Sequence, residues 1–484
     1  MNQTFLFHDY ETFGVDPRRD RPVQFAAIRT DQDFNVIGRP IELFSQISPD
    51  YLPAAEACLV TGITPQIAQQ RGLPEAEFMR KVNAAMSEPG TCTIGYNSIR
   101  FDDEVTRHSL YRNLIEPYGR EWQNGNSRWD IIDLVRTCHA LRPEGIEWPK
   151  NEQGNVSFKL ELLTVANDLA HENAHDAVSD VYATIAMAKL IKEKQPKLFD
   201  FLYQNRSKQR VESMLVDAMT DAKGPQPVMH ISGRISPVQG CGAWVVPVFR
   251  DPKQKTKFLT INLTMDLEPL LELSAEQFAE RLYAKRELLE QQGLKPLPIK
   301  WIQSNKCPVV APAKTLRPED AERIGIDRDE CLVQLKLLQQ HSAAIIEKIE
   351  LWHHIESQRE MPPQDADTAL YDGFIGDADK KVMEHIHTLE PTQLSGIHNA
   401  FNDARLNTLL FRYKARNYPH TLDYDEQQKW MAFCKQRVTE SGQGWQTLTE
   451  FEQRIEKLGQ VHADNSRNMR ILKQCVDYVR ATYG

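Results

Sequence analysis

The sequence predicts an N-terminal α/β domain, a smaller β-rich domain and an all-helical C-terminal part. Three observations predict this order. Short apolar runs are interspersed with helical patterns up to about residue 192, β-rich runs separated by Gly, Pro and Lys follow at 226–265, and the pattern is helical from about residue 352. The chain of 484 residues is too long for one compact core, and its length suggests roughly two to four domains.

The first domain is expected to begin with strands and to continue with helices. Strands are expected at residues 5–8, 24–29, 36–44 and 91–97. One helix should follow Thr64, which can cap it, with Pro65 in its first position. Further helices are expected at residues 75–86, 102–114, 130–140, 160–169 and 176–192.

The rest of the chain is divided in the same way. In the middle part, strands are expected at 228–231, 243–249 and 258–263, which fits a small barrel or sheet, and helices at 275–291 and 331–340. C-terminal helices are expected at 377–387, 401–416, 424–439 and 447–458. The expected domains are therefore residues 1–192, 196–350 and 352–484.

Composition narrows the class of protein. Hydrophobic residues make up 41% and charged residues 26% of the chain, as in ordinary soluble proteins. The net charge of −9 argues against a generally basic surface, although a locally basic cleft can still bind nucleic acid. The eight cysteines stand singly, without a C-x-x-C pair, which favours reduced core thiols over disulfides or a cysteine zinc site. No signal peptide and no apolar span of about 20 residues is present, so we expect a cytoplasmic protein that does not enter the membrane.

Two acids follow the first apolar run. Asp9 and Glu11 are two residues apart, so on a strand their side chains point to the same face. Clustered carboxylates repel one another unless a cation or a proton lies between them. A single D-x-E pair more often marks the end of an ordinary surface strand, so the interpretation depends on the other motifs.

Three further residues have the chemistry to complete such a site. Asp102 follows a predicted strand and opens a helix, where a carboxylate can also simply stabilise the helix N-terminus. His175 is expected in the loop before the next helix and Asp180 in that helix's second turn, so that both can point into one cleft. The alternative for His175 is a loop histidine that hydrogen-bonds to backbone.

The segment from His171 to His175 also matches H-E-x-x-H, the signature of zinc proteases. We reject this alternative because the flanking Asn167, Asp168 and Asn173 are typical of a loop and not of an apolar helix. A zinc protease would also leave the acids at the start of the chain unexplained.

In sequence order, the motifs D-x-E, N-x-x-x-F-D and H-x-x-x-x-D resemble those of the DEDDh 3′→5′ exonucleases, of the ribonuclease H-like class. The resemblance implies two Mg²⁺ ions, for which Mn²⁺ can substitute, because hard cations prefer oxygen ligands. By the family pattern, Asp9 bridges both ions, Glu11 and Asp180 complete one site, and Asp102 serves the other. His175 would act as general base on the attacking water.

Residues between 107 and 136 alternate arginines with aromatic rings, a mixture that suits single-stranded nucleic acid. The alternative is an amphipathic helix pair with solvated arginines and core rings. Lys159 and Lys208 are further candidates for phosphate contacts, and Lys300 adds to a basic face of the middle domain together with the lysines of 253–257.

A closer resemblance extends over nearly the whole chain. The segments that carry it are residues 8–14, 100–107, 126–130, 140–145, 305–308, 315–320 and 411–417, and they are similar to the bacterial exodeoxyribonuclease I family. The resemblance implies a ribonuclease H-like exonuclease domain with a mixed sheet flanked by helices, then an SH3-like β-barrel domain and an all-α C-terminal domain. It also implies a monomer with a role in DNA repair and recombination.

The implied activity is processive 3′→5′ hydrolysis of single-stranded DNA to 5′-mononucleotides. The resemblance suggests Arg107, Tyr118, Trp122 and Arg136 as contacts of the strand. The expected substrate contacts also include Glu11, Lys159, Lys208 and Lys300. Family members often carry arginine where this chain has Lys159, which keeps the charge but not the bidentate fork. Arg142 and Arg317 would lie in a basic pocket for the acidic tail of the single-stranded DNA-binding protein.

Two alternatives remain open at the level of the residues. The first is a 3′→5′ exoribonuclease of the same catalytic class, because nothing in the motifs recognises the 2′-hydroxyl that distinguishes RNA. The second is a catalytically silent protein that only binds single-stranded DNA.

Overall fold

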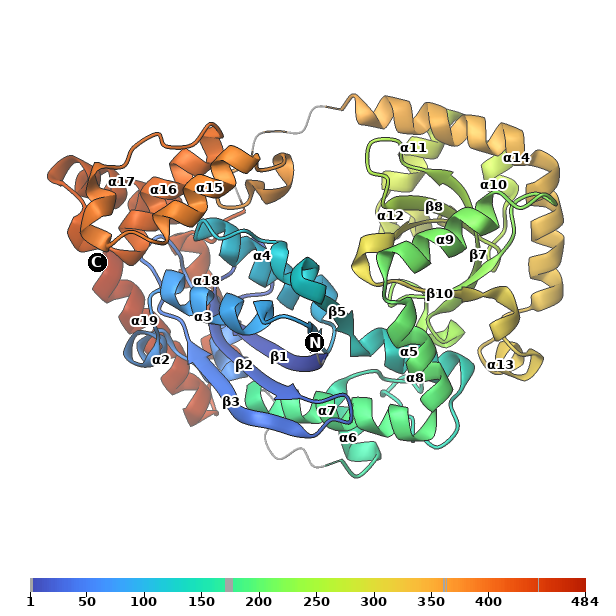
Figure 1. Ribbon diagram of the computed structural model, residues 1–484, viewed down its shortest axis with the longest axis horizontal. Coiled ribbons are helices and arrows are strands. Elements are labelled where there is room, and N and C mark those ends of the chain that lie inside the picture. The colour runs from blue at the N-terminus through green and yellow to red at the C-terminus, as the bar shows by residue number, and fades with distance from the viewer. Residues whose placement is uncertain (1–2, 170–176, 360–361, 363, 443) are drawn as a thin grey trace. The chain divides into compact units, whose positions relative to one another are not determined.

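The structure is a computed structural model that describes residues 3–169, 177–359, 362, 364–442 and 444–484 (Figure 1). The chain forms two compact units. The first consists of Met1–Arg128, His171–Ile185 and Pro363–Gly484, and the second of Trp129–Ala170 and Ala186–Pro362. The N-terminal and C-terminal parts of the chain therefore share one unit. The domain boundaries predicted near residues 192 and 352 differ from this division and stay a prediction.

The first unit is built on a mixed sheet of strand order β3-β2-β1-β4-β5. Its strands are β1 (Thr4–Thr12), β2 (Pro22–Thr30), β3 (Val36–Phe44), β4 (Thr91–Gly95) and β5 (Ser127–Asp130), and the boundary between the units falls within β5. β1 pairs antiparallel with β2 along its length but parallel with β4 only from Thr4 to Phe7. β1 therefore extends well past the end of its pairing with β4.

The two faces of β1 have different neighbours. Leu6 and Tyr10 point into a core formed with Phe25 of β2 and with side chains of α3 (Glu75–Ser87) and α4 (Asp102–Arg112). Phe5 and Phe7 point to the opposite face, where their rings contact Phe34. Because side chains alternate along a strand, Asp9 and Glu11 continue the face of Phe5 and Phe7.

The other helices of the first unit come from both ends of the chain. They are α1 (Ala55–Thr61), α2 (Pro65–Arg71), α15 (Asp377–Ile386), α16 (Ala404–Asn417), α17 (Tyr424–Thr439), α18 (Leu448–Val461) and α19 (Ser466–Tyr483), with the start of α7 (Ala177–Lys194). α2 begins as expected, with Pro65 in its first turn and the Thr64 hydroxyl accepting a hydrogen bond from the Ile67 N–H at 3.5 Å. α19 packs on α1 and α2, where Cys58 and Cys475 lie in one buried apolar cluster.

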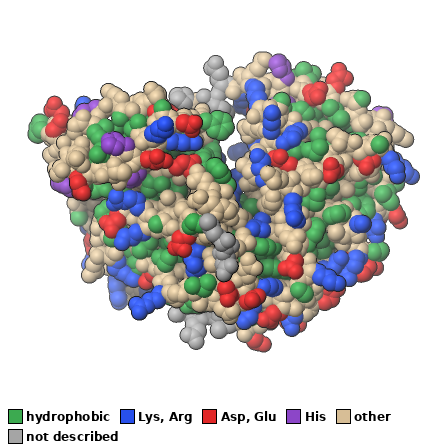
Figure 2. Space-filling model, in the orientation of Figure 1, with side chains coloured by type: hydrophobic (Ala, Val, Ile, Leu, Met, Phe, Trp, Pro, Cys, Tyr) green, Lys and Arg blue, Asp and Glu red, His purple; other side chains and the backbone are tan. Residues whose placement is uncertain are grey.

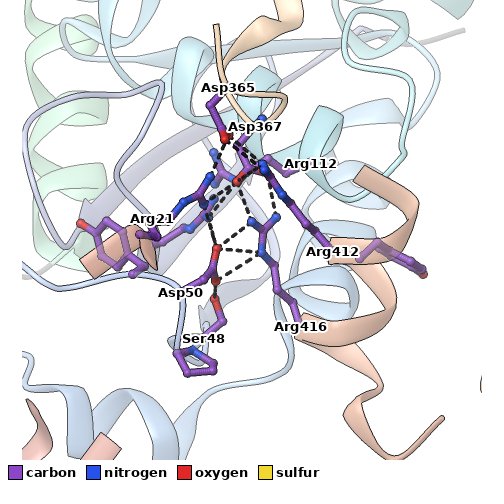
Figure 3. Close-up of polar contacts among 12 residues, drawn as sticks. Arg21, Ser48, Asp50, Arg112, Asp365, Asp367, Arg412 and Arg416 are labelled. Carbon is purple, nitrogen blue, oxygen red and sulfur yellow. Dashed lines mark hydrogen bonds and ion pairs between the residues drawn. The ribbon is translucent and has the colours of Figure 1, made fainter. Parts of the chain in front are cut away.

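Charged side chains also join the two ends of the chain. The buried carboxylates of Asp50 and Asp367 both accept hydrogen bonds from Arg416 and Arg437, which lie on α16 and α17 (Figure 3). Residues more than 300 positions apart therefore form one buried ion-pair cluster within this unit.

The second unit contains a five-stranded antiparallel sheet of order β10-β6-β7-β8-β9. Its strands are β6 (Val228–Ile231), β7 (Gly242–Arg250), β8 (Lys257–Asn262), β9 (Ile299–Gln303) and β10 (Val309–Pro312). Its helices are α5 (Ile131–Leu141), α6 (Leu160–Ala166), α8 (Pro196–Asn205), α9 (Lys208–Met219), α10 (Glu268–Glu272), α11 (Ala275–Tyr283), α12 (Arg286–Gln291), α13 (Pro318–Arg323) and α14 (Arg328–Ser357).

Some expectations about the second unit were wrong in detail. The three strands expected between 228 and 263 are confirmed within a few residues, but β9 and β10 were not expected. The single helix expected over 275–291 is two helices, because the chain becomes extended at Ala284 and Lys285. The helix expected over 331–340 is the N-terminal part of the much longer α14.

The surface and the cysteines agree with the composition. Figure 2 shows basic and acidic side chains interspersed over the visible face. All eight cysteines are free thiols, and all but Cys307 are buried, so seven of them lie in the interior of the fold. Among the described residues, no helix combines the length and the apolar character needed to cross a membrane.

Candidate active site

The structure brings three of the predicted carboxylates together. Asp9 and Glu11 on β1 and Asp180 on α7 each place a ligand oxygen within 4.8 Å of the others, and all three side chains are partly buried. Asp9 and Glu11 share a face because they are two residues apart on a strand. Asp180 lies in the first turn of α7, not in the second turn as expected.

Asp102 lies beside this cluster, at the first position of α4. Its carboxylate oxygen Oδ1 accepts a hydrogen bond of 3.2 Å from the N–H of Tyr10, the residue between Asp9 and Glu11. The pairing of β1 with β4 ends at Phe7. The buried Asp102 side chain therefore supplies an acceptor to the part of β1 that β4 does not reach.

The electrostatics of the cluster favour a cation. Burial and, to a smaller extent, the neighbouring Asp180 carboxylate raise the pKa of Asp9 to about 8, although the backbone N–H of Tyr10 acts in the opposite direction. A divalent cation would remove this repulsion, and carboxylate oxygens are the ligands that Mg²⁺ and Mn²⁺ prefer. The residues present thus fit a divalent metal centre.

The expected general base cannot be placed. His175, like His171, lies outside the described residues. Its role as general base stays a prediction.

The arginines on and near α4 are buried, which the sequence did not indicate. Asp103 is buried and forms ion pairs with Arg120 at 2.9 Å and Arg128 at 2.6 Å. Arg107, a predicted substrate contact, is also buried and donates to Glu121 at 2.7 Å and 2.8 Å. These arginines are neither solvated nor on an open surface, because internal carboxylates hold them in place.

The aromatic side chains of the same segment are more accessible. Trp122 is 67% exposed, and Tyr118 is partly buried with the Arg107 guanidinium 5.4 Å from its ring centroid. Sequence reasoning missed two rings from the C-terminal part of the chain. The hydroxyl of Tyr371 donates to Glu104 of α4 at 2.5 Å, and Phe374, three residues later, is fully exposed. A Y-x-x-F pair in a loop carries no sequence signal for this position.

The remaining predicted strand contacts belong to the second unit. Arg136 forms an ion pair with Asp133 at 2.7 Å. Lys159 is 72% exposed and lies 3.9 Å from Glu161 of the following helix, α6. Lys208 is also exposed and lies 3.9 Å from Glu212, one turn further along the same helix, α9. Lys300 on β9 is partly buried.

Arg142 and Arg317 are brought together although they are 175 positions apart. Both contact the buried carboxylate of Asp320, at 3.4 Å and 2.6 Å respectively, and Arg317 also lies 3.1 Å from Glu144. The two guanidinium groups are about one-third exposed, so this surface presents positive charge to solvent beside Asp320.

Comparison with known proteins accounts for the whole chain. An exonuclease family model matches residues 6–188, a model of the exonuclease I SH3-like domain matches 206–354, and a model of the exonuclease I C-terminal domain matches 364–482. These matches confirm the predicted order of folds.

The chain is 46% identical to exodeoxyribonuclease I of Haemophilus influenzae, over 98% of both chains. The structure of Escherichia coli exonuclease I in complex with a dA16 oligonucleotide is similar, with a TM-score of 0.91 and 43% identity over 99% of this chain and 100% of the other. A structure of SSB/exonuclease I with the inhibitor CFAM has a TM-score of 0.89 at 43% identity and covers all of both chains. The chain therefore belongs to the exodeoxyribonuclease I family.

Proposed function

We propose that this chain hydrolyses single-stranded DNA from its 3′ end at a two-metal centre formed by Asp9, Glu11, Asp102 and Asp180. Membership of the family makes the chain a 3′→5′ exonuclease of single-stranded DNA. The choice of residues is supported by one observation: the carboxylates of Asp9, Glu11 and Asp180 lie close together, although Asp180 is far from the other two in the sequence.

Each residue has a distinct task in this proposal. Asp9 would be a ligand of both Mg²⁺ ions, Glu11 and Asp180 would complete one site, and Asp102 would serve the other from the start of α4. When bound, the ions would supply charge stabilisation to the attacking and the leaving oxygen of an in-line displacement. His175 accepts the proton of the attacking water, and the product is a 5′-mononucleotide.

The test is a time course on 5′-labelled single-stranded DNA, with and without Mg²⁺ and with a duplex control. Loss of an outer-shell partner of a metal ligand already costs about 10–100-fold in metal affinity or activity, so Asp9→Ala or Asp180→Ala should lower the rate more than about 100-fold. Strand binding should remain nearly intact, because the substitutions remove negative charge near phosphates. Hydrolysis by either variant at the wild-type rate would contradict the site. Asp377→Ala, an exposed acid of the same unit, is the matched control.

The bases of the strand are proposed to stack on rings of the first unit. The exposed ring of Trp122 and the partly buried ring of Tyr118 come from the segment after α4, and the exposed Phe374 adds a ring from the C-terminal part of the chain. Tyr371 links that part to α4 through Glu104. Such stacking tolerates any base, as processive degradation of a mixed sequence requires.

Phosphates of the strand are proposed to contact cations of the second unit, namely Arg136, Lys159, Lys208 and Lys300. Arg107 is the corresponding candidate in the first unit, and its buried ion pair with Glu121 gives it a fixed position. Glu11 is a proposed substrate contact of a different kind, because a carboxylate repels a phosphate. Comparing degradation of matched DNA and RNA oligonucleotides tests the alternative of an exoribonuclease. The activity of the wild-type chain on DNA in the time course tests the alternative of a silent binding protein.

Arg142 and Arg317 are proposed to bind the acidic tail of the single-stranded DNA-binding protein. Their convergence on Asp320, and a relative solved with SSB, support this partner. An acidic peptide would compete with Glu144 and Asp320 for the two guanidinium groups. Binding of a labelled acidic-tail peptide should be lost in Arg317→Glu and kept in Lys314→Glu, which changes a nearby lysine. We further propose a cytoplasmic monomer that acts in DNA repair and recombination.

A further inference from the structure

Tyr10 lies between two of the proposed metal ligands but points away from them. Its side chain is buried in the core between the sheet and helices α3 and α4, with its ring centroid 4.9 Å from that of Phe25. Nothing in the metal chemistry requires a tyrosine at this position. A phenylalanine would fill the same core volume, so the hydroxyl group needs a separate explanation.

The hydroxyl is used in a contact with α4. It is joined to the hydroxyl of Thr106 by a buried hydrogen bond of 3.0 Å, and the Thr106 hydroxyl also lies 2.8 Å from the backbone carbonyl of Asp102. A hydroxyl carries a single proton. When Thr106 donates its proton to the Asp102 carbonyl, Tyr10 must donate to Thr106. The three groups then form one continuous chain of hydrogen bonds.

Tyr10 therefore holds α4 at two points that are one helical turn apart. Its backbone N–H donates to the side chain of Asp102, and its side chain contacts Thr106, four residues later. Two attachments fix both the distance and the rotation of the first turn of α4 relative to β1. β1 carries Asp9 and Glu11, and α4 carries Asp102, so these attachments also fix the spacing between the acids.

We propose that Tyr10 is a positioning residue that, through Thr106, sets the distance of Asp102 from Asp9 and Glu11 and thereby the affinity of the centre for Mg²⁺. This inference rests on the proposed two-metal function. It predicts a particular kinetic effect, because Mg²⁺ requires nearly ideal octahedral geometry and is sensitive to ligand placement. Loss of the Tyr10 hydroxyl should change the concentration of Mg²⁺ that the enzyme needs more than its rate at saturating Mg²⁺.

The experiment measures two quantities on the full chain: the dissociation constant of Mg²⁺ by isothermal titration calorimetry without DNA, and initial rates of single-stranded DNA hydrolysis as a function of Mg²⁺ concentration. The dissociation constant and the Mg²⁺ concentration for half-maximal rate should rise together. Tyr10→Phe and Thr106→Val remove the two hydroxyls and keep the shape of the side chains. Tyr111→Phe is the matched control: Tyr111 is buried on the same helix, and its hydroxyl has no hydrogen-bond partner among the described residues. Thr106→Ser keeps the hydroxyl group and should behave as the wild type.

In Tyr10→Phe the Mg²⁺ concentration for half-maximal rate should rise about tenfold, as for other outer-shell partners of metal ligands. Thr106→Val should show at least as large a rise, because it also removes the hydrogen bond to the Asp102 carbonyl. The double variant should be no worse than Thr106→Val, because that variant has already lost the hydrogen bond between Tyr10 and Thr106. Saturating Mg²⁺ should restore most of the rate.

Two results would overturn the inference. One is a Mg²⁺ dependence of Tyr10→Phe equal to that of Tyr111→Phe, even if thermal stability falls. The other is a rate that falls equally at every Mg²⁺ concentration, which indicates a general structural role. Asp9→Ala separates this inference from the proposed function. If that variant stays active, the metal centre itself is wrong, whereas an inactive Asp9→Ala with a normal Tyr10→Phe overturns only the role of Tyr10.

Discussion

Replacing Asp50 by asparagine should strongly destabilise the first unit. The Asp50 carboxylate is fully buried and accepts hydrogen bonds from Arg416 at 2.7 Å and Arg437 at 2.9 Å, with Arg21 at 3.5 Å (Figure 3). Burial by itself would raise the pKa of Asp50, but the neighbouring Arg416, Arg21 and Arg437 outweigh this effect and lower the pKa below its ordinary value. The carboxylate is therefore ionised, and its charge is needed to balance the buried arginines.

The size of the effect follows from what the substitution leaves behind. Asparagine keeps the shape of the side chain but removes its charge, so the guanidinium groups of Arg416 and Arg437 stay buried with less compensation. Breaking a buried pair by removing one partner costs about 3–5 kcal/mol. Total stabilities are about 5–15 kcal/mol, so Asp50→Asn should remove a third or more of a typical free energy of unfolding.

Urea unfolding followed by tryptophan fluorescence measures this loss. Trp445 reports on the cluster directly, because the Arg437 guanidinium lies 4.1 Å from the centroid of its ring. With a slope of about 3 kcal/mol per M urea, a loss of 3–5 kcal/mol moves the midpoint down by about 1 M or more. The control is Asp377→Asn, whose side chain is 97% exposed and pairs with Lys380 across 3.8 Å, so its midpoint should not move. A midpoint shift in Asp50→Asn as small as that of the control would refute the reasoning.

Three further predictions concern pH, salt and stacking. Stability should fall as the pH drops below about 4, because neighbouring arginines outweigh burial and lower the pKa of Asp50, Asp103 and Asp367 below the unfolded value of about 3.9. The free energy that these ionised carboxylates contribute is fully present above the unfolded pKa and is lost as the pH falls through the folded pKa. Circular dichroism during an acid titration measures the loss. Despite the net charge of −9, the logarithm of the affinity for single-stranded DNA should fall linearly with the logarithm of the salt concentration. An affinity that does not change with salt in a fluorescence-anisotropy titration would contradict an electrostatic site. Trp122→Ala should weaken strand binding by about 1–3 kcal/mol in the same assay without changing the urea midpoint, because this ring is exposed.

The parts of the site that could be predicted from sequence are those that local periodicity determines. Asp9 and Glu11 share a face because a strand has a period of two, and Asp102 opens a helix because it follows a strand and a turn. Thr64 and Pro65 mark the start of α2 through capping chemistry that involves only neighbouring residues. In each case the controlling contact lies within a few positions of the residue.

The parts that could not be predicted depend on distant partners. The sequence shows an arginine at position 107 but not that Glu121 will hold it inside the protein, and it gives no sign that Arg416 pairs with Asp50, 366 positions away. The interpretation of a basic, strand-facing segment therefore overestimated how many of its arginines reach the surface. β9 was missed for a related reason, since its run of Ile299–Gln303 contains a lysine and becomes a strand only by pairing with β8.

The same distant contacts connect the C-terminal helices with β1, the strand that carries Asp9 and Glu11. β1 leads directly into the loop at Phe13, whose carbonyl lies 3.0 Å from the hydroxyl of Tyr51 and accepts the N–H of Ala54 at 2.8 Å. Asp50, next to Tyr51, is the residue that Arg416 and Arg437 of α16 and α17 hold in place. The C-terminal end of β1 is therefore attached to the segment of Asp50 and Tyr51, and α16 and α17 hold that segment through Asp50. Because metal ligands tolerate little displacement, we expect these helices to influence the geometry of the proposed ligands Asp9 and Glu11 without supplying a ligand.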